Sequence, residues 1–212
     1  YHIRDLWDPD VGAGSPYRSC DFRKNAVSLG LGTDRRGIVH LAAELKYDRT
    51  GYGPDFVEYD SDAWTWGITA IVRPVRGLRL DATYALRSSA ARGYDEIGET
   101  KATSDDSDIS YEQDEYSLRA RWAAGRVRDI PVVFVLGGRM ARRFYQTDRT
   151  AQDDPYHAGR DDTYMTFWLR NGWEIAPDLT LEGFYVLRTR SAESEFTDEI
   201  GTLKDYTAHR AG

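Results

Sequence analysis

Hydrophobic and polar residues alternate along most of the chain. Val39 and Leu41, for example, flank His40, and the same two-residue period recurs in many other segments. This is the period of a β-strand, whose successive side chains point to opposite faces of the sheet. The pattern predicts eight strands, at about 27–32, 39–47, 64–72, 78–87, 116–124, 132–140, 165–174 and 181–188. Residues 1–7 and 205–212 are expected to belong to two more, so we predict at least ten strands.

The connections between the predicted strands alternate in length. Short connections lie near 33–37, 74–77, 125–131 and 176–179, and long ones near 8–23, 48–62, 90–115, 146–162 and 191–204. Pro74, Pro131 and Pro177 lie in short turns, where a missing N–H breaks no strand ladder. No segment shows a helical period over three turns. The sequence therefore predicts one antiparallel, up-and-down, all-β domain over residues 1–212, expected to be incomplete at one or both ends.

Composition narrows the class of protein. No apolar run approaches the ~18 residues of a spanning helix, which argues against a helical membrane protein. Aromatic residues make up 13% of the chain, too many for a disordered segment. The net charge of −7 argues against a nucleic-acid partner. Cys20 is the only cysteine, so neither an internal disulfide nor a cysteine metal cluster is expected.

The apolar face of these strands has two possible environments, the protein interior or lipid. In a soluble barrel or sandwich it turns inward, and in a transmembrane barrel it turns outward to lipid. The apolar series run over about ten positions, which suits the ~9–11 residues of a tilted spanning strand. Aromatic residues also gather near strand ends, as in the girdles at membrane interfaces. The aromatics predicted to lie at the lipid interface are Trp64, Trp66, Tyr84, Trp122, Trp173 and Tyr185.

Charge is separated along the chain in a way that favours the membrane interpretation. The windows 48–62, 93–115, 149–162 and 191–205 hold 23 of the 35 Asp and Glu residues but only 5 of the 28 Lys and Arg residues. The long loops are therefore acidic and the predicted strands basic. We expect a transmembrane β-barrel with short periplasmic turns and long acidic outer loops. A soluble barrel is the alternative.

In this layout the chain resembles, over nearly its whole length, the outer-membrane β-barrel proteins of Gram-negative bacteria. The resemblance implies a porin-like barrel in the bacterial outer membrane, in contact with lipid and lipopolysaccharide. Residues 78–87 and 179–188 repeat one strand pattern after a proline turn. This is similar to the large barrels that sheathe multihaem cytochromes. The chain has no Cys-x-x-Cys-His motif, so any haem would belong to a partner protein, and no cofactor is expected here.

Basic residues occupy the polar positions of the predicted strands. The residues predicted to line the barrel interior are Arg79, Asp81, Arg87, Arg119, Arg121, Arg139, Arg170, Glu174, Glu182 and Arg188. Rings of Arg or Lys favour anions in a pore. Alternatively, Asp81, Glu44, Glu174 and Glu182 pair with the arginines and fill a small barrel of about ten strands. The true strand number decides between an open and a filled interior.

The acidic loops offer one weak metal candidate. Asp105, Asp106 and Asp108 could bind a divalent cation through carboxylate oxygens, although the glycine and terminal glutamate of the known calcium loop are missing. The alternative is an acidic, solvated rim that shares divalent ions with lipopolysaccharide phosphates.

An enzyme is the third class considered. The omptin proteases of the outer membrane have ten strands and acidic pairs on their outer loops. Asp60 and Asp62 resemble their carboxylate pair, and Asp154 with His157 resembles their Asp–His pair, in which the histidine polarises a water. The Asp–His spacing is three residues here and two in that family. No Gly-x-Ser-x-Gly, phosphate-loop or zinc motif is present.

The sequence thus predicts a non-enzymatic function. The first expectation is a passive pore, or the barrel scaffold of a transport or secretion complex with a protein partner. The alternatives are a non-conducting structural or binding barrel, including a sheath for a partner such as a cytochrome, and an omptin-like surface protease.

Overall fold

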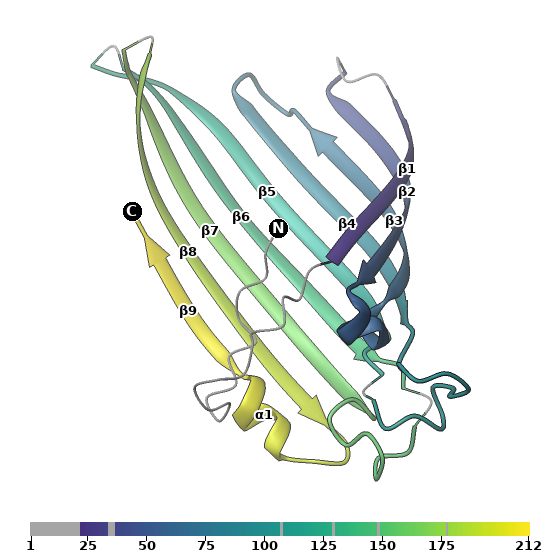
Figure 1. The fold of residues 1–212 in the computed structure, drawn as a ribbon. Helices are drawn as coiled ribbons and strands as arrows, with labels where there is room; N and C mark the ends of the chain where they lie inside the picture. Colours follow the sequence, from purple (N-terminus) through teal and green to yellow (C-terminus); the bar gives the residue numbers. More distant parts are fainter. Residues whose placement is uncertain (1–21, 34–36, 107, 129, 148, 177) are drawn as a thin grey trace.

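The fold is an almost entirely β-structure, seen in a computed structural model of the chain (Figure 1). The structure describes residues 22–33, 37–106, 108–128, 130–147, 149–176 and 178–212, apart from the side chains of residues 54 and 55. The strands are β1 (Phe22–Gly32), β2 (Val39–Tyr52), β3 (Ser61–Val72), β4 (Leu78–Ala91), β5 (Tyr111–Val127), β6 (Ile130–Tyr145), β7 (Arg160–Ala176), β8 (Leu179–Ser194) and β9 (Tyr206–Ala211). Two short helices accompany them, η1 (Pro54–Tyr59) and α1 (Glu199–Lys204).

The nine strands form one sheet in sequence order, and every neighbouring pair is antiparallel. This confirms the predicted up-and-down topology and all eight strands of the alternating pattern. The expected strand at 205–212 is β9, and the one expected at 1–7 lies outside the described residues. Across the described residues the sheet is open, with β1 and β9 as its two edges, so the expected closure is not present in this part of the chain.

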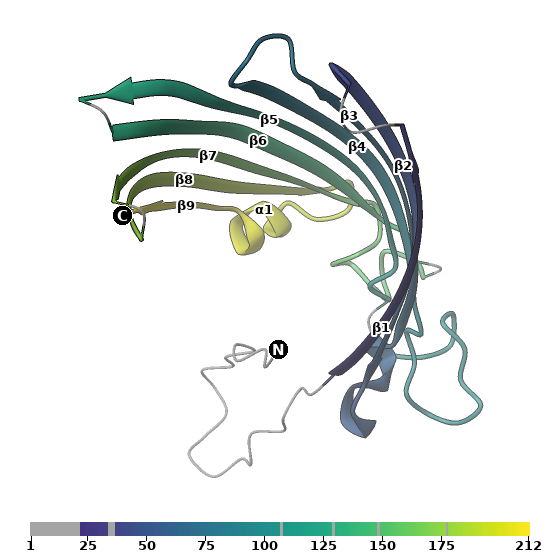
Figure 2. The same cartoon turned by 90° about the horizontal axis from the view of Figure 1, so that it is seen from above.

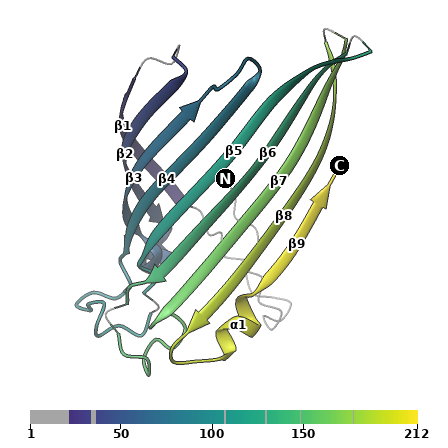
Figure 3. The same cartoon turned by 180° about the vertical axis from the view of Figure 1, so that it is seen from behind.

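Short and long connections lie at opposite ends of the sheet (Figures 1 and 3). The short turns follow β1, β3, β5 and β7. At the other end lie η1, the loops 92–110 and 146–159, and α1. The strands extend further into this end than the alternation predicted, since β2 continues to Tyr52 and β5 begins at Tyr111. Within the described part of the chain, no helix has the length and hydrophobicity to span a bilayer.

Strand register brings the apolar series of all eight predicted strands onto one face of the sheet. One row across the sheet joins Leu29, Leu45, Trp66 and Leu86, and another joins Leu118, Gly138, Phe167 and Leu187. A shift of one residue at any pair would have sent that strand's apolar side chains to the other face. We call this surface the apolar face, and the opposite one the polar face.

The sheet is bent into an open trough, with α1 on its inner side (Figure 2). Side chains converge on the concave face of a bent sheet and spread apart on the convex face. Asp48 and Asp162 on the polar face are at most 1% exposed, whereas Leu118 on the apolar face is 66% exposed. The polar face is therefore concave, and the apolar face is convex.

The short-turn end is shaped by irregularities in β5 and β7. The register shifts between Ala123 and Gly125 and again between Glu174 and Ala176. Gly77, which ends the turn before β4, has a φ of +85°, and a Cβ there would lie 2.9 Å from the carbonyl oxygen of Ala123. Only glycine meets both demands without strain.

Candidate functional site

The polar face carries every residue predicted to line a barrel interior. Arg79 lies opposite Arg121, and Arg121 in turn opposite Val135, which pairs with Arg170. The other seven predicted residues occupy positions of the same parity in the register of their strands. The arginines thus form one basic surface on the concave side of the sheet.

Three of the seven arginines in this set are held by carboxylates. Arg79 binds Asp81 at 2.6 Å, Arg139 binds Glu115 at 2.6 Å, and Arg87 binds Asp48 at 2.9 Å. Arg87 also donates to the hydroxyl groups of Thr65 and Tyr111. These contacts fix the three guanidinium groups against the sheet, so they are less available to a ligand.

The other four, Arg119, Arg121, Arg170 and Arg188, form no ion pair with another described residue. Three of them line a cleft of about 480 Å³ near the short turns, together with Glu174, Glu182 and Trp168. The indole of Trp168 covers Gly137, where a Cβ would lie 2.2 Å from the ring. The cleft therefore combines unpaired positive charge with an aromatic wall.

The alternative predicted from the sequence, in which carboxylates pair with the arginines and fill the interior, is only partly present. Of the four carboxylates proposed for it, Asp81 alone binds an arginine. Among the described residues, Glu44, Glu174 and Glu182 form no ion pair. This part of the polar face is therefore lined by charges that are open to the concave side.

A dense polar network covers the polar face at the long-loop end. Asp162 is fully buried and accepts two hydrogen bonds from Arg160, at 2.8 Å each, and one from Arg190 at 2.7 Å. Asp48, 1% exposed, is surrounded in the same way by Arg87, Lys46 and Lys24. Buried charges are tolerated only when they are paired in this manner. These ion pairs join β2 to β4 and β7 to β8 at this end of the concave face.

The six aromatics predicted at a lipid interface all lie on the apolar face. Trp122 stacks on Phe134 near the short turns, and Trp64 lies against Tyr47 near the long loops. Trp66 and Tyr84, by contrast, lie in the interior of their strands.

Two tyrosines mark where the apolar face becomes charged. The hydroxyl of Tyr84 donates to Asp114 at 3.0 Å, and that of Tyr47 donates to Asp62. Beyond them, Arg142 binds Asp161 at 2.7 Å on the same face.

The Asp154–His157 pair predicted from the sequence does form. His157 Nδ1 lies 2.8 Å from Asp154 Oδ1, and Asp154 also accepts the backbone N–H of Asp108 at 3.3 Å. Burial by itself raises the pKa of Asp154, but the hydrogen bond and charge of His157, aided by the amide of Asp108, outweigh it, and the net pKa is lowered. Asp154 is 3% exposed and joins two loops.

The other acidic pair of the protease hypothesis also has structural partners. Asp60 Oδ1 accepts the backbone N–H of Tyr52 at 2.6 Å, and Asp62 accepts the hydroxyl of Tyr47. None of these described contacts joins Asp60 and Asp62 to Asp154 and His157. Asp60, Asp62, Asp154 and His157 thus make structural contacts, within the loops and at the border of the apolar face.

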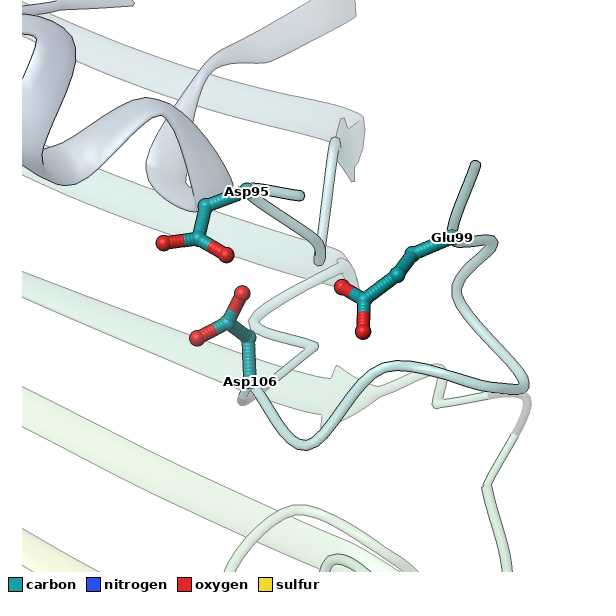
Figure 4. A group of neighbouring side chains, drawn as sticks. All are labelled: Asp95, Glu99 and Asp106. Atoms are coloured by element: carbon teal, nitrogen blue, oxygen red, sulfur yellow. The ribbon is translucent and has the colours of Figure 1, made fainter. Parts of the chain in front are cut away.

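Carboxylates do gather in the loop 92–110, but not as the sequence suggested. Asp106 lies with Asp95 and Glu99, and their carboxylate oxygens are all within 4.8 Å of one another (Figure 4). Asp108 is fully buried and bound by Lys101 at 3.2 Å, and Asp105 is exposed. Asp105 and Asp108 thus stand apart from the cluster that contains Asp106.

Glu58, at the end of η1, belongs to the same surroundings. Burial raises the pKa of its carboxyl group, a hydrogen bond from its own backbone amide lowers it, and the negative charges of Asp106 and Asp95 add to the net rise. Glu58, Asp95 and Glu99 were not among the site residues predicted from the sequence. The four-residue spacing of Asp95 and Glu99 is a weak signal, and the approach of η1 to this loop is a tertiary feature that alternation does not reveal.

Comparisons with protein-family models, curated proteins and solved structures found no match to this chain.

Proposed function

We propose that this chain forms the wall of a transmembrane β-barrel in the bacterial outer membrane, with the apolar face in lipid. The observation that carries the proposal is an apolar surface that is continuous over eight strands and yet exposed. Val27, Trp66 and Leu118, far apart on it, are 73%, 61% and 66% exposed. Monomeric soluble proteins rarely expose contiguous apolar patches larger than a few hundred Å².

The height of the apolar face suits a bilayer. In β6 it runs from Val132 to Met140 and is followed by Arg142, and in β7 it runs from Trp173 back to Met165. Nine residues at ~3.4 Å each cover ~30 Å along the strand, or ~23 Å at a tilt of ~40°. The lipid-facing band of outer-membrane barrels is ~25 Å tall.

The border of the apolar face has the chemistry of a membrane interface. Tyr47 and Tyr84 keep their rings on the apolar side and donate their hydroxyls to Asp62 and Asp114. Tyrosine favours such borders because its ring is apolar and its hydroxyl is polar. The ion pair of Arg142 and Asp161 then lies on the aqueous side.

Strand direction determines how many further strands closure of the barrel requires. In an up-and-down sheet of nine strands, β1 and β9 run in the same direction, so they would meet as a parallel pair. Closure by antiparallel pairs alone takes an odd number of further strands, from this chain or from another. A closed barrel leaves no exposed strand edge in lipid, where unpaired backbone groups are costly.

The interior of this barrel is basic and favours anions. Arg119, Arg121 and Arg170 present guanidinium groups without a described carboxylate partner to the concave side. Rings of arginine in a pore attract anions. We therefore propose a passive pore, or the barrel scaffold of a transport complex, that prefers anionic solutes.

A second candidate shares the same wall. The cleft beside Trp168 could instead receive the acidic surface of a partner protein inside a non-conducting barrel, which would act as a sheath. The unpaired arginines support both functions, and conductance separates them.

Planar-bilayer recording across a salt gradient tests the pore. We expect steady conductance with a reversal potential of the sign that indicates anion preference. The variant Arg119→Gln/Arg121→Gln/Arg170→Gln should shift the reversal potential toward zero. Arg142→Gln, which removes an arginine from the apolar face, should leave it unchanged. Insertion without conductance would overturn the pore and favour the sheath, and a protein that stays monodisperse without detergent would overturn the membrane barrel.

A further inference from the structure

The cluster of Asp95, Glu99 and Asp106 lies in the loop 92–110, between β4 and β5 at the long-loop end of the sheet. All three carboxylates point toward one another (Figure 4). Acidic residues on a loop normally spread out into solvent, because like charges repel. A cation between them would offset this repulsion.

Buried carboxylate oxygens without partners supply an independent observation. Glu58 is 9% exposed, and its Oε2 has no hydrogen-bond partner among the described residues. Glu99 Oε2 is buried and lacks a described partner as well. A carboxylate oxygen removed from water without a donor or a cation is unfavourable by several kcal/mol or more.

Backbone hydrogen bonds hold Glu58 beside the start of the loop that contains the cluster. The amide of Gly93 donates to the carbonyl oxygen of Glu58 at 2.8 Å, and the amide of Arg92 donates to that of Asp60 at 2.7 Å. The end of η1 is thereby attached to the start of the loop, two residues before Asp95.

The basic residues nearby are engaged elsewhere. Lys101 binds Asp108 and Ser110, and Arg149 donates to the carbonyl oxygens of Lys101 and Gly93. The guanidinium of Arg92 lies over the ring of Tyr94, 4.7 Å from its centroid. The described part of the chain therefore leaves the four carboxylates without a protein cation.

The geometry points to a divalent-cation site formed by Asp95, Glu99 and Asp106, with the buried carboxylate of Glu58 beside them, and to Ca²⁺ as the ion it fits. Oxygens up to 4.8 Å apart can share an ion that forms bonds of ~2.4 Å, which is the length of Ca²⁺–oxygen bonds. Mg²⁺ bonds of ~2.0–2.1 Å would require the loop to contract. Ca²⁺ also accepts the irregular geometry of a loop.

Bound Ca²⁺ would join η1 to both halves of the loop 92–110. The site stands apart from the arginine-lined surface and does not depend on whether the apolar face meets lipid. It would make the long-loop end sensitive to Ca²⁺.

Calorimetric titration of the full chain, folded in detergent and stripped with a chelator, tests the site. We expect saturable uptake of about one Ca²⁺ per chain and weaker binding of Mg²⁺. Asp95→Asn/Asp106→Asn should weaken Ca²⁺ binding about tenfold or more, because affinity depends on the charge of the ligand set. The matched control is Glu96→Gln/Asp105→Asn, which removes the same charge one residue away in the same loop and should keep binding within about twofold.

Two results would overturn the site. One is the absence of saturable Ca²⁺ uptake by the unaltered chain at about 1 mM, a concentration at which extracellular calcium modules bind. The other is an equal loss of affinity in the two double variants, which would show a diffuse effect of charge. If Asp95→Asn/Asp106→Asn does not fold, Glu99→Gln replaces it against Glu96→Gln, with the same two criteria.

Discussion

At the scale of the residue, the face on which a side chain lies determines its surroundings. Asp161 and Asp162 are adjacent in β7, but Asp162 is fully buried among Arg160, Arg190 and Tyr164, whereas Asp161 forms an exposed pair with Arg142. The chemical group is the same and the polarity of its environment differs. Their energetic contributions should differ accordingly.

Asp162→Asn is expected to destabilise the protein much more than Asp161→Asn. Loss of the Asp162 charge leaves two arginines close together and poorly solvated, at a cost of about 3–5 kcal/mol. Loss of the exposed Asp161 pair should cost less than about 1 kcal/mol. Urea unfolding of the two variants measures the free energies. Equal losses would contradict the assignment of β7's two faces.

A neighbouring pair of glycines gives a second residue-level prediction. A Cβ at Gly137 would overlap the indole of Trp168, while one at Gly138 would meet only the carbonyl oxygen of Thr166 at 3.9 Å. Gly137→Ala should therefore displace Trp168, cost about 1–3 kcal/mol and change the tryptophan fluorescence. Gly138→Ala should be close to neutral. Unchanged fluorescence in Gly137→Ala would show that the ring does not cover this position.

At the scale of the element, the strands could be predicted from sequence and their ends could not. Alternation placed all eight strands, because a sheet with one apolar and one polar face imposes a period of two. It missed residues 48–52 of β2 and 111–115 of β5, where Asp48 and Gln113 follow the polar-face register but the sequence looks like a loop. It also missed η1 and α1, which are too short to show a helical period.

Contacts between elements were equally hidden from the sequence. The arginines could be assigned to one face from alternation alone, yet Arg190, one partner of Asp162, comes from the neighbouring strand β8, and Glu58 reaches the loop of Asp106 through η1. Pairing of this kind is set by tertiary packing. The spacing of residues along one strand contains no record of it.

Asp154 binds His157 in its own loop and the amide of Asp108 in the loop 92–110, and we call this contact between the two long loops the clamp. It gives a pH prediction at the scale of the element. The folded-state pKa of Asp154 is lowered from its ordinary value of ~3.9. Its carboxylate therefore stabilises the loops above about pH 4, and this contribution is lost as pH falls through the lowered pKa.

Hydrogen exchange of residues 92–110 and 146–159, corrected for intrinsic rates, measures the loss of the clamp. Protection should fall below about pH 4 in the unaltered chain, and Asp154→Asn should lack this protection at every pH. The control Asp153→Asn, in which the altered residue is an exposed neighbour, should behave like the unaltered chain. Protection of these loop amides that does not change with pH would contradict the clamp.

At the scale of the whole molecule, the two faces of one bent sheet differ in their chemistry. The convex face is apolar over a height of about nine residues per strand and carries exposed side chains such as Leu118, and the concave face carries arginines near the short turns and a paired network at the long-loop end. A soluble protein would bury the first of these surfaces. A barrel in a membrane uses both as they are.

The orientation of the two faces is the central claim, and nitroxide accessibility tests it most directly. Single labels are placed at Ser117→Cys and Leu118→Cys, adjacent residues on opposite faces of β5, in a Cys20→Ser background reconstituted into lipid vesicles. We predict that the label at 118 is relaxed by dissolved oxygen and the label at 117 by a water-soluble nickel chelate. The reverse preference, or access of the nickel chelate to both positions, would contradict a lipid-facing apolar surface.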